Sequence, residues 1–143
     1  MKPDCLRPMF AAWLCVAAGV VRADIVVITN LDNPVQALTA RQVSDLFLGR
    51  TRTFPGGAGT LILEQPRQAH TREEFFRRLN GMNLKQLNAY WARLQFSGEV
   101  QPPAQLEDNA AVLAGVRKNT AAIGYVDSSA VDTSVRVVLR LKE

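Results

Sequence analysis

Hydrophobic and polar positions alternate along the chain with two different periods, which separate strands from helices. Residues 25–29 are a continuous run of β-branched side chains, typical of a strand covered on both faces as in a parallel sheet. Residues 60–64 predict a second, short strand, and residues 121–126 predict a third. In residues 135–141 apolar side chains alternate with polar ones, so we expect a half-exposed strand at an edge of the sheet.

Four other segments carry apolar residues three and four positions apart, the spacing of one face of an α-helix. Each follows a side chain that can accept hydrogen bonds from the free N–H groups of a helix start. The expected caps are Thr39, Thr71, Asn83 and Asp108. Glu73 precedes Arg77 by four positions, and Glu74 precedes Arg78 by four. We therefore expect two ion pairs that place both arginines on a solvated helix face.

Two features limit how these elements combine. Pro102 and Pro103 exclude a helix or a central strand from residues 101–107, which we expect to be an exposed connection. Gly124 lies inside a predicted strand, where we expect it to allow another part of the chain to approach closely. The resulting order, β-α-β-α-α-α-β-β, predicts a single α/β domain.

The N-terminal residues have the pattern of a secretory leader. Lys2 and Arg7 form a basic stretch, followed by an almost wholly apolar run and by a small-x-small cleavage pattern that ends at Ala23. The apolar run is short for a membrane span, which argues against an uncleaved anchor. We therefore expect a signal peptide in residues 1–23 and an exported domain in residues 24–143, periplasmic where the host has two membranes.

Cysteine content and charge narrow the class of protein. Cys5 and Cys15 both fall in the expected leader, which leaves residues 24–143 without a disulfide or a thiol. The bulky residues before Cys15 argue against a lipidated cysteine. The formal net charge is +4 for the whole chain and falls to +2 without the leader, which carries three basic residues and one acidic residue. This charge is too small to argue for a nucleic-acid partner.

The residue types needed for catalysis or for metal binding are sparse. His70 is the only histidine, and no serine lies in a G-x-S-x-G motif. A catalytic pair would have to combine His70 with Glu64 or Glu73. One histidine without cysteines gives no zinc-binding spacing, and the acidic residues form no calcium loop. We therefore expect neither catalysis nor a metal or cofactor, and the simplest interpretation of His70 is an exposed loop residue.

One segment has the features of an anion site. Residues 64–71 run from the end of a predicted strand into a helix start, the place where ligands bind in open α/β sheets. Helix-start N–H groups favour anions, and Arg67 can add a bidentate contact near His70 and Thr71. Thr29 and Asn30 end the first strand, and we expect them at the same edge of the sheet, where they would supply neighbouring hydrogen bonds. Both loops also fit plain turns.

Three separated segments resemble, in the correct order, the phosphate-type periplasmic solute-binding proteins of ABC transporters. They are Asp45-Leu46-Phe47-Leu48-Gly49-Arg50 with the preceding Leu38-Thr39, residues 72–75 with Tyr90-Trp91, and residues 119–126, which contain Ala122-Ile123-Gly124-Tyr125. The resemblance covers nearly all of residues 24–143. It implies one lobe of a type II periplasmic-binding-protein fold, a mixed sheet flanked by helices. It also implies phosphate or a similar small oxyanion as ligand, and an ABC transporter or another envelope protein as partner.

Two departures from the family pattern leave two hypotheses open. Full members have two lobes, whereas residues 24–143 supply about one. Where the family has an arginine and then a serine-glycine-threonine cradle, this chain has Arg67, followed by Ala69, His70 and Thr71. The first hypothesis is a single-lobe protein that holds an oxyanion with Arg67, Thr71 and helix-start N–H groups. The second is an interaction module that has lost its ligand and docks on a sensor, a transporter or a second copy of itself as a homodimer.

Overall fold

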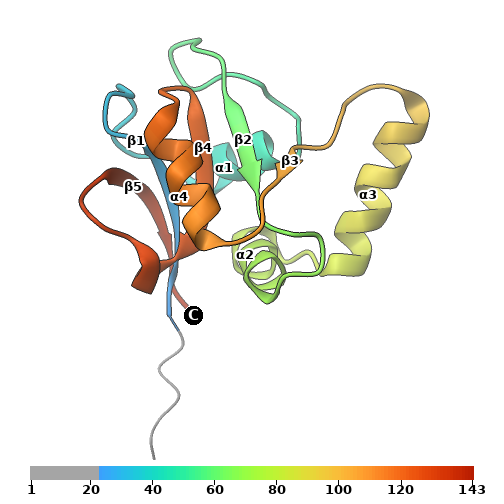
Figure 1. Ribbon diagram of the computed structural model, residues 1–143. Helices are drawn as coiled ribbons and strands as arrows, with labels where there is room; N and C mark the ends of the chain where they lie inside the picture. The colour runs from blue at the N-terminus through green and yellow to red at the C-terminus, as the bar shows by residue number, and fades with distance from the viewer. Residues whose placement is uncertain (1–22) are drawn as a thin grey trace, which may run out of the picture.

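A five-stranded mixed sheet with the strand order β3-β2-β4-β1-β5 lies at the centre of the protein (Figure 1). This computed structural model describes residues 23–143, so the expected leader lies outside the described residues apart from Ala23. The strands are β1 (Ile25–Asn30), β2 (Leu61–Glu64), β3 (Ala104–Gln105), β4 (Ala122–Asp127) and β5 (Val135–Leu141). The helices are α1 (Ala40–Phe47), α2 (His70–Asn80), α3 (Leu84–Ser97) and α4 (Asn109–Lys118), with a 3-10 turn at Ser128–Ala130.

The first strand, β1, is buried along its whole length, as its β-branched run predicts. The expected parallel pairing is wrong for this strand, because β1 runs antiparallel to both of its neighbours, β4 and β5. Parallel pairing occurs instead between β2 and β4 and between β2 and β3. β1 is buried because Ile25 and Val27 pack with the core under α1 and α2, whereas Val26 and Ile28 pack with the core under α4. A continuous apolar run therefore indicates that both faces of a strand are covered, but it does not indicate whether the strand is parallel or antiparallel to its neighbours.

Three of the four expected helix caps are confirmed. Thr39 and Asn83 form complete capping boxes at α1 and α3, and the Asp108 side chain accepts a hydrogen bond at the start of α4. Thr71 is not a cap, because α2 begins at His70 and its N-cap residue is Ala69. A turn between Pro66 and Ala69 starts the helix earlier than the capping-box spacing suggests. The hydroxyl of Thr71 donates instead to Asp127 Oδ2, at 3.4 Å.

The last strand, β5, lies at the edge of the sheet, as predicted. Its simple alternation is interrupted, because the pairing with β1 shifts at Val138. Val135, before the shift, packs with the core under α4, whereas Leu141, after it, packs with the core under α1 and α2. An extra residue in one strand of a pair exchanges the two faces of that strand, so its apolar side chains serve both cores.

The segment after α3 contains neither a helix nor a central strand, as the prolines predict, but it does contain a short, exposed edge strand. Residues 104–105 form β3, which pairs with β2 at the other edge of the sheet. Pro102 and Pro103 lie just before this two-residue strand, where no ladder hydrogen bond is required of them. The helix α3 lies to one side of the sheet (Figure 1) and packs through Leu87 and Trp91, while Phe96 near its end is 97% exposed.

Candidate functional site

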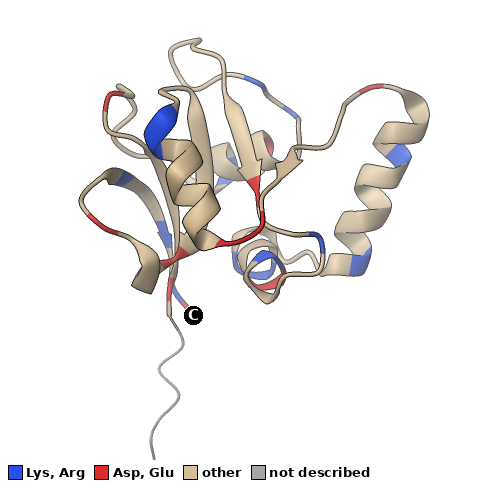
Figure 2. Ribbon diagram, viewed as in Figure 1, with Lys and Arg blue, Asp and Glu red and all other residues tan. Residues whose placement is uncertain are grey.

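The carboxyl ends of β2 and β4 and the starts of α2 and α4 meet at one end of the sheet, the lower end in Figure 1. This arrangement follows from the parallel pairing of β2 with β4, because each strand then leads to the same end. Residues 65–69 connect β2 to α2 there. Figure 2 shows acidic residues at the end of β2 and just before α4, so this end of the sheet is not basic as a whole.

Thr29 and Asn30 lie at the opposite end of the sheet, so the expectation that they join the site is wrong. The reason is the direction of β1, which runs antiparallel to β4. The Asn30 amide donates to the carbonyls of Val116 (2.9 Å) and Arg117 (3.0 Å) and thereby satisfies the last turn of α4. Thr29 is fully buried. Both residues therefore belong to the interior packing between β1 and α4.

The other predicted site residues divide between two small pockets. Arg67 lines a pocket of about 170 Å³ between α2, α3 and the segment that contains β3, here called the arginine pocket. His70 and Thr71 line a pocket of about 160 Å³ between α2, the start of β1 and the end of β4, here called the Asp127 pocket. The structure thus separates Arg67 from Thr71, although both were expected in one anion site.

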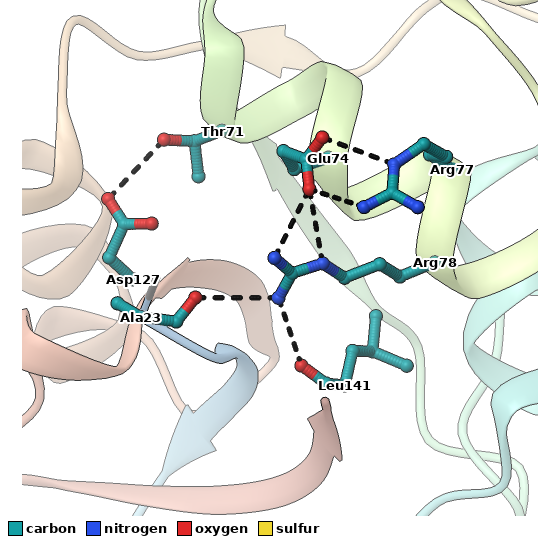
Figure 3. A network of polar contacts seen from close by, with 7 residues as sticks. All are labelled: Ala23, Thr71, Glu74, Arg77, Arg78, Asp127 and Leu141. Carbon is teal, nitrogen blue, oxygen red and sulfur yellow. Dashed lines mark hydrogen bonds and ion pairs between the residues drawn. The ribbon is translucent and has the colours of Figure 1, made fainter. Parts of the chain in front are cut away.

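The Asp127 pocket contains polar groups that already bind one another (Figure 3). Asp127 Oδ2 accepts hydrogen bonds from Thr71 Oγ1 (3.4 Å) and from Asn109 Nδ2 (2.9 Å). Two carboxylates, those of Asp127 and Glu74, and one guanidinium, that of Arg78, line this pocket. An incoming anion would meet an excess of negative charge, so the pocket is a poor anion site.

Arg77 and Arg78 differ in exposure, although the spacing of the ion pairs predicts that both are solvated. Both pair with Glu74, Arg77 Nη2 at 2.7 Å and Arg78 Nη2 at 3.1 Å, and neither pairs with Glu73. The hydrogen bond from Arg77 is the main cause that lowers the pKa of Glu74 to about 2. The side chain of Arg77 is half exposed, as expected, but that of Arg78 is only 5% exposed. Arg78 also donates to the carbonyls of Ala23 and Leu141, so it joins α2 to the residues just before β1 and to the end of β5 (Figure 3).

The arginine pocket has the opposite charge. Its lining includes two guanidinium groups, those of Arg67 and Arg72, and no carboxylate. Neutral polar groups and an aromatic wall complete it: Asn88, Gln95 and Gln105, with Trp91, Ala92, Pro102 and Pro103. Arg67 is exposed at the rim, whereas Arg72 is 3% exposed. A small anion in this pocket would therefore contact one exposed and one buried arginine.

A buried carboxylate lies behind Arg72. Glu64, at the end of β2, is 1% exposed, and its Oε1 accepts hydrogen bonds from the Tyr125 hydroxyl and from the backbone N–H of Gln65. Glu64 Oε2 stands 3.7 Å from Arg72 Nε, and neither of these two atoms has a hydrogen-bond partner. Burial raises the pKa of Glu64 to about 7, although the hydrogen bond from Tyr125 and the charge of Arg72 both lower it.

Sequence reasoning did not identify Arg72 as a site residue, although its position carried a signal. Arg72 precedes Phe75 by three positions and Phe76 by four, so it shares the apolar face of α2 with them. A charged residue on a buried helix face needs a partner, because an unpaired buried charge is costly. The same signal would have pointed to Glu64, the acidic residue that ends an otherwise apolar strand.

Within residues 23–143, no group of three or more histidine, cysteine, aspartate or glutamate side chains is placed to hold a metal ion. None of the helices in that part of the chain has the length and apolar character needed to cross a bilayer.

Comparison with known proteins identifies the fold. No family model matches the sequence, and no curated protein matches it. A Clostridium perfringens protein, described as a phosphate ABC transporter substrate-binding protein and solved with bound phosphate, superposes with a TM-score of 0.65 at 23% identity. The match covers 81% of this chain and 44% of that one. An ABC-type phosphate transport receptor from Vibrio cholerae gives a TM-score of 0.64 at 18% identity, with coverages of 81% and 45%. PstS from Borrelia burgdorferi gives 0.61 at 12% identity, with coverages of 81% and 46%.

These matches confirm the fold that the resemblance implies, the mixed sheet with flanking helices of a periplasmic-binding-protein lobe. The chain spans less than half the length of the solved structures that it matches. Those proteins are named for phosphate binding and transport and not for catalysis.

Proposed function

We propose that this protein is an exported domain that binds phosphate or a similar small oxyanion in the arginine pocket, as part of, or derived from, an ABC-type phosphate uptake system. The observation that carries the proposal is the position of Arg67 and Arg72, which line one small pocket beside the carboxyl end of β2. The leader pattern in residues 1–23 supports export. The fold shared with phosphate-transport proteins supports the choice of ligand class.

Charge decides between the two pockets. The arginine pocket has two cationic side chains and no carboxylate in its lining, whereas the Asp127 pocket has two carboxylates and one arginine that is already paired with Glu74. An oxyanion is stabilised by cations and repelled by carboxylates at short range. We therefore assign the ligand to Arg67 and Arg72 and leave Thr71 and His70 outside the binding contact.

Size and chemistry fit a small ligand. A volume of about 170 Å³ is well below the roughly 300–1,000 Å³ of pockets that hold drug-sized molecules. Guanidinium groups present parallel N–H donors, the arrangement that matches the oxygens of phosphate, sulfate or carboxylate. Trp91, which is 6% exposed, and the two prolines give the pocket an apolar part, and apolar surroundings strengthen charge interactions.

The same lining argues for binding without a chemical step. Nucleophilic and acid–base catalysis need a serine, threonine, cysteine, lysine, histidine, aspartate or glutamate at the reacting atoms. None of these residue types lines the arginine pocket. A bound oxyanion would therefore be held and released unchanged.

Isothermal titration calorimetry of the purified protein with phosphate, sulfate and acetate tests this function. We expect phosphate or sulfate to bind the unchanged protein and Arg41→Ala, a matched control that removes an exposed arginine on α1. Arg67→Ala should weaken that binding at least tenfold, because a charge-assisted contact contributes roughly 1.5–3 kcal/mol. If none of the three anions gives heat at millimolar concentration, the proposal is wrong, and the interaction-module hypothesis gains support.

A further inference from the structure

We infer that Arg72 is the buried cation that holds the oxyanion, and that Glu64 takes up a proton when the anion binds. This inference rests on the proposed function, which already places the ligand at Arg67 and Arg72, and adds Glu64 and a linked proton to it. The geometry that supports it is one buried arginine that lies between Glu64 and the arginine pocket. One side of Arg72 faces Glu64, and the other side belongs to the lining of the arginine pocket.

The contact between Arg72 and Glu64 is incomplete. Arg72 Nη1 is held in place by the backbone carbonyl of Arg67 (3.0 Å) and by Asn88 Oδ1 (3.2 Å). The closest approach to Glu64 is 3.7 Å, between Nε and Oε2, and both atoms are buried without a hydrogen bond. A buried ion pair compensates for the loss of water only when its geometry is good and its remaining donors and acceptors are satisfied. This pair therefore leaves part of the charge of Arg72 available to a better acceptor.

The groups around Glu64 hold its carboxyl close to equal populations of the protonated and ionised forms at neutral pH. From β4, Tyr125 donates a hydrogen bond to Oε1, and the backbone N–H of Gln65 donates another. Among residues 23–143, Arg72 on α2 is the charged group that acts on the carboxyl of Glu64. From the β3 segment, the N–H of Leu106 donates to the main-chain oxygen of Glu64 and not to its carboxyl. Burial opposes these groups and raises the pKa of the carboxyl to about 7. A modest change in the local field is then enough to move the proton.

An anion in the arginine pocket supplies that change. It brings negative charge close to Glu64 and competes for Arg72, and both effects disfavour the ionised carboxylate. When Glu64 is ionised, the three side chains Arg67, Arg72 and Glu64 sum to one positive charge. When Glu64 is protonated, they sum to two, which matches a divalent oxyanion. By linkage, protonation must then strengthen anion binding by the same factor by which anion binding favours protonation.

Sulfate is the appropriate probe, because it keeps its charge from pH 6 to pH 8.5, whereas phosphate titrates near neutrality. We expect the sulfate affinity of the full chain to be nearly constant below about pH 7 and to fall above it, approaching about tenfold per pH unit for one linked proton. In calorimetry at pH 7, the observed heat should depend on the ionisation enthalpy of the buffer in the direction of proton uptake.

The variant Glu64→Gln tests whether the pH dependence of sulfate affinity comes from Glu64 or from other groups in the protein. The variant keeps the size of the side chain and an oxygen that can accept from Tyr125, but it cannot ionise. We expect it to bind sulfate with little change between pH 6 and pH 8.5 and without buffer dependence. If it shows the same pH profile as the unchanged protein, or if the unchanged protein has no profile, the proton linkage is wrong while the oxyanion site stands. Absence of sulfate and phosphate binding in both proteins at every pH would overturn the proposed function and this inference together.

Tyr125→Phe provides a second variant that leaves Glu64 in place. It removes a hydrogen bond that lowers the pKa of the carboxyl, so the pH at which sulfate affinity begins to fall should move upward. Circular dichroism and a urea titration establish that each variant is folded. If Tyr125→Phe is folded and binds sulfate with an unshifted profile, Glu64 is not the group that takes up the proton.

Discussion

Gly124 in β4 lies directly beneath Val112 in α4: a Cβ atom at position 124 would stand 2.5 Å from Val112 Cγ1 and 3.4 Å from the backbone oxygen of Leu63. The position of this glycine inside a strand predicts such a close approach, and the approaching element is α4, the helix that starts at the candidate site. The missing side chain lets α4 pack directly on the sheet between β2 and β1.

Gly124→Ala should therefore destabilise the protein, because the added methyl group needs space that the core does not have. Overpacking of this kind costs typically about 1–3 kcal/mol of unfolding free energy. Urea unfolding followed by circular dichroism measures the change. Gly59→Ala is the matched control, because nothing lies within 4 Å of the position of its Cβ. Equal stability of the two variants would show that α4 can shift away from β4 without loss.

The helix starts could be predicted from the sequence where their stabilising contacts lie within a few residues of one another. Thr39 and Asn83 act on N–H groups within their own first turn, so the spacing of the capping box is enough to place them. The direction of β1 could not be predicted in this way, because it depends on pairing with β4 and β5, about a hundred positions away. Since the expected position of Asn30 relied on that direction, the error in pairing also produced the error in the site.

The division of the predicted anion site has a similar origin. Arg67 and Thr71 are four positions apart, but a turn at residues 66–69 separates them and directs them to different pockets. The acidic partner of Arg72 was not predicted, because Glu64 precedes it by eight positions on another element. The position of Arg72 on an apolar helix face predicts that it is buried, but it does not predict which residue is its partner.

The raised pKa of Glu64 predicts that stability falls as pH rises. The folded state holds the proton up to about pH 7, whereas the ordinary value of the unfolded carboxyl is 4.5. The folded state therefore binds more protons between these values, and the contribution of Glu64 to stability is present below pH 4.5 and lost as pH rises through 7. The loss amounts to about 3 kcal/mol for the full shift.

Urea titrations at pH 5 and pH 8 test this prediction. We expect the stability of Glu64→Gln, relative to that of the unchanged protein, to be higher at pH 8 than at pH 5. The reason is that the variant has no carboxyl group that loses its proton inside the protein as pH rises through 7, whereas both proteins keep Arg72 buried. A difference between the two proteins that is the same at both pH values would mean that Glu64 keeps an ordinary pKa in the folded state.

The ion pair between Glu74 and Arg78 should contribute to the stability of the contact between α2 and the sheet. Glu74→Gln removes the carboxylate from the guanidinium of Arg78, which is only 5% exposed. We expect a loss of about 1–3 kcal/mol in unfolding free energy at pH 7, as for a buried charged group that loses its partner. Because the pKa of Glu74 is lowered to about 2, its contribution is present above pH 4.5 and lost as pH falls through 2.

Glu73→Gln is the control for this variant, since it makes the same chemical change one position earlier on an exposed part of α2. Surface substitutions of this kind usually change stability by less than about 0.5 kcal/mol. Thermal unfolding of both variants at pH 7 gives the comparison. A larger effect for Glu73→Gln than for Glu74→Gln would contradict the assignment of Arg78 to Glu74.

Two variants that each change the negative charge of one pocket can test which pocket binds the oxyanion. Asp127→Asn removes a carboxylate from the Asp127 pocket, and Gln105→Glu adds one to the arginine pocket. If the oxyanion binds between Arg67 and Arg72, Gln105→Glu should weaken sulfate binding at least tenfold at pH 7, because like charges repel strongly at short range, whereas Asp127→Asn should change the affinity less than twofold. If the oxyanion binds at Thr71 instead, Asp127→Asn should strengthen binding and Gln105→Glu should have little effect. The variant whose sulfate affinity changes therefore identifies the site. If it is Gln105→Glu, the ligand binds at Arg72, and if Gln105→Glu is unaffected while Asp127→Asn binds more tightly, the ligand binds at Thr71.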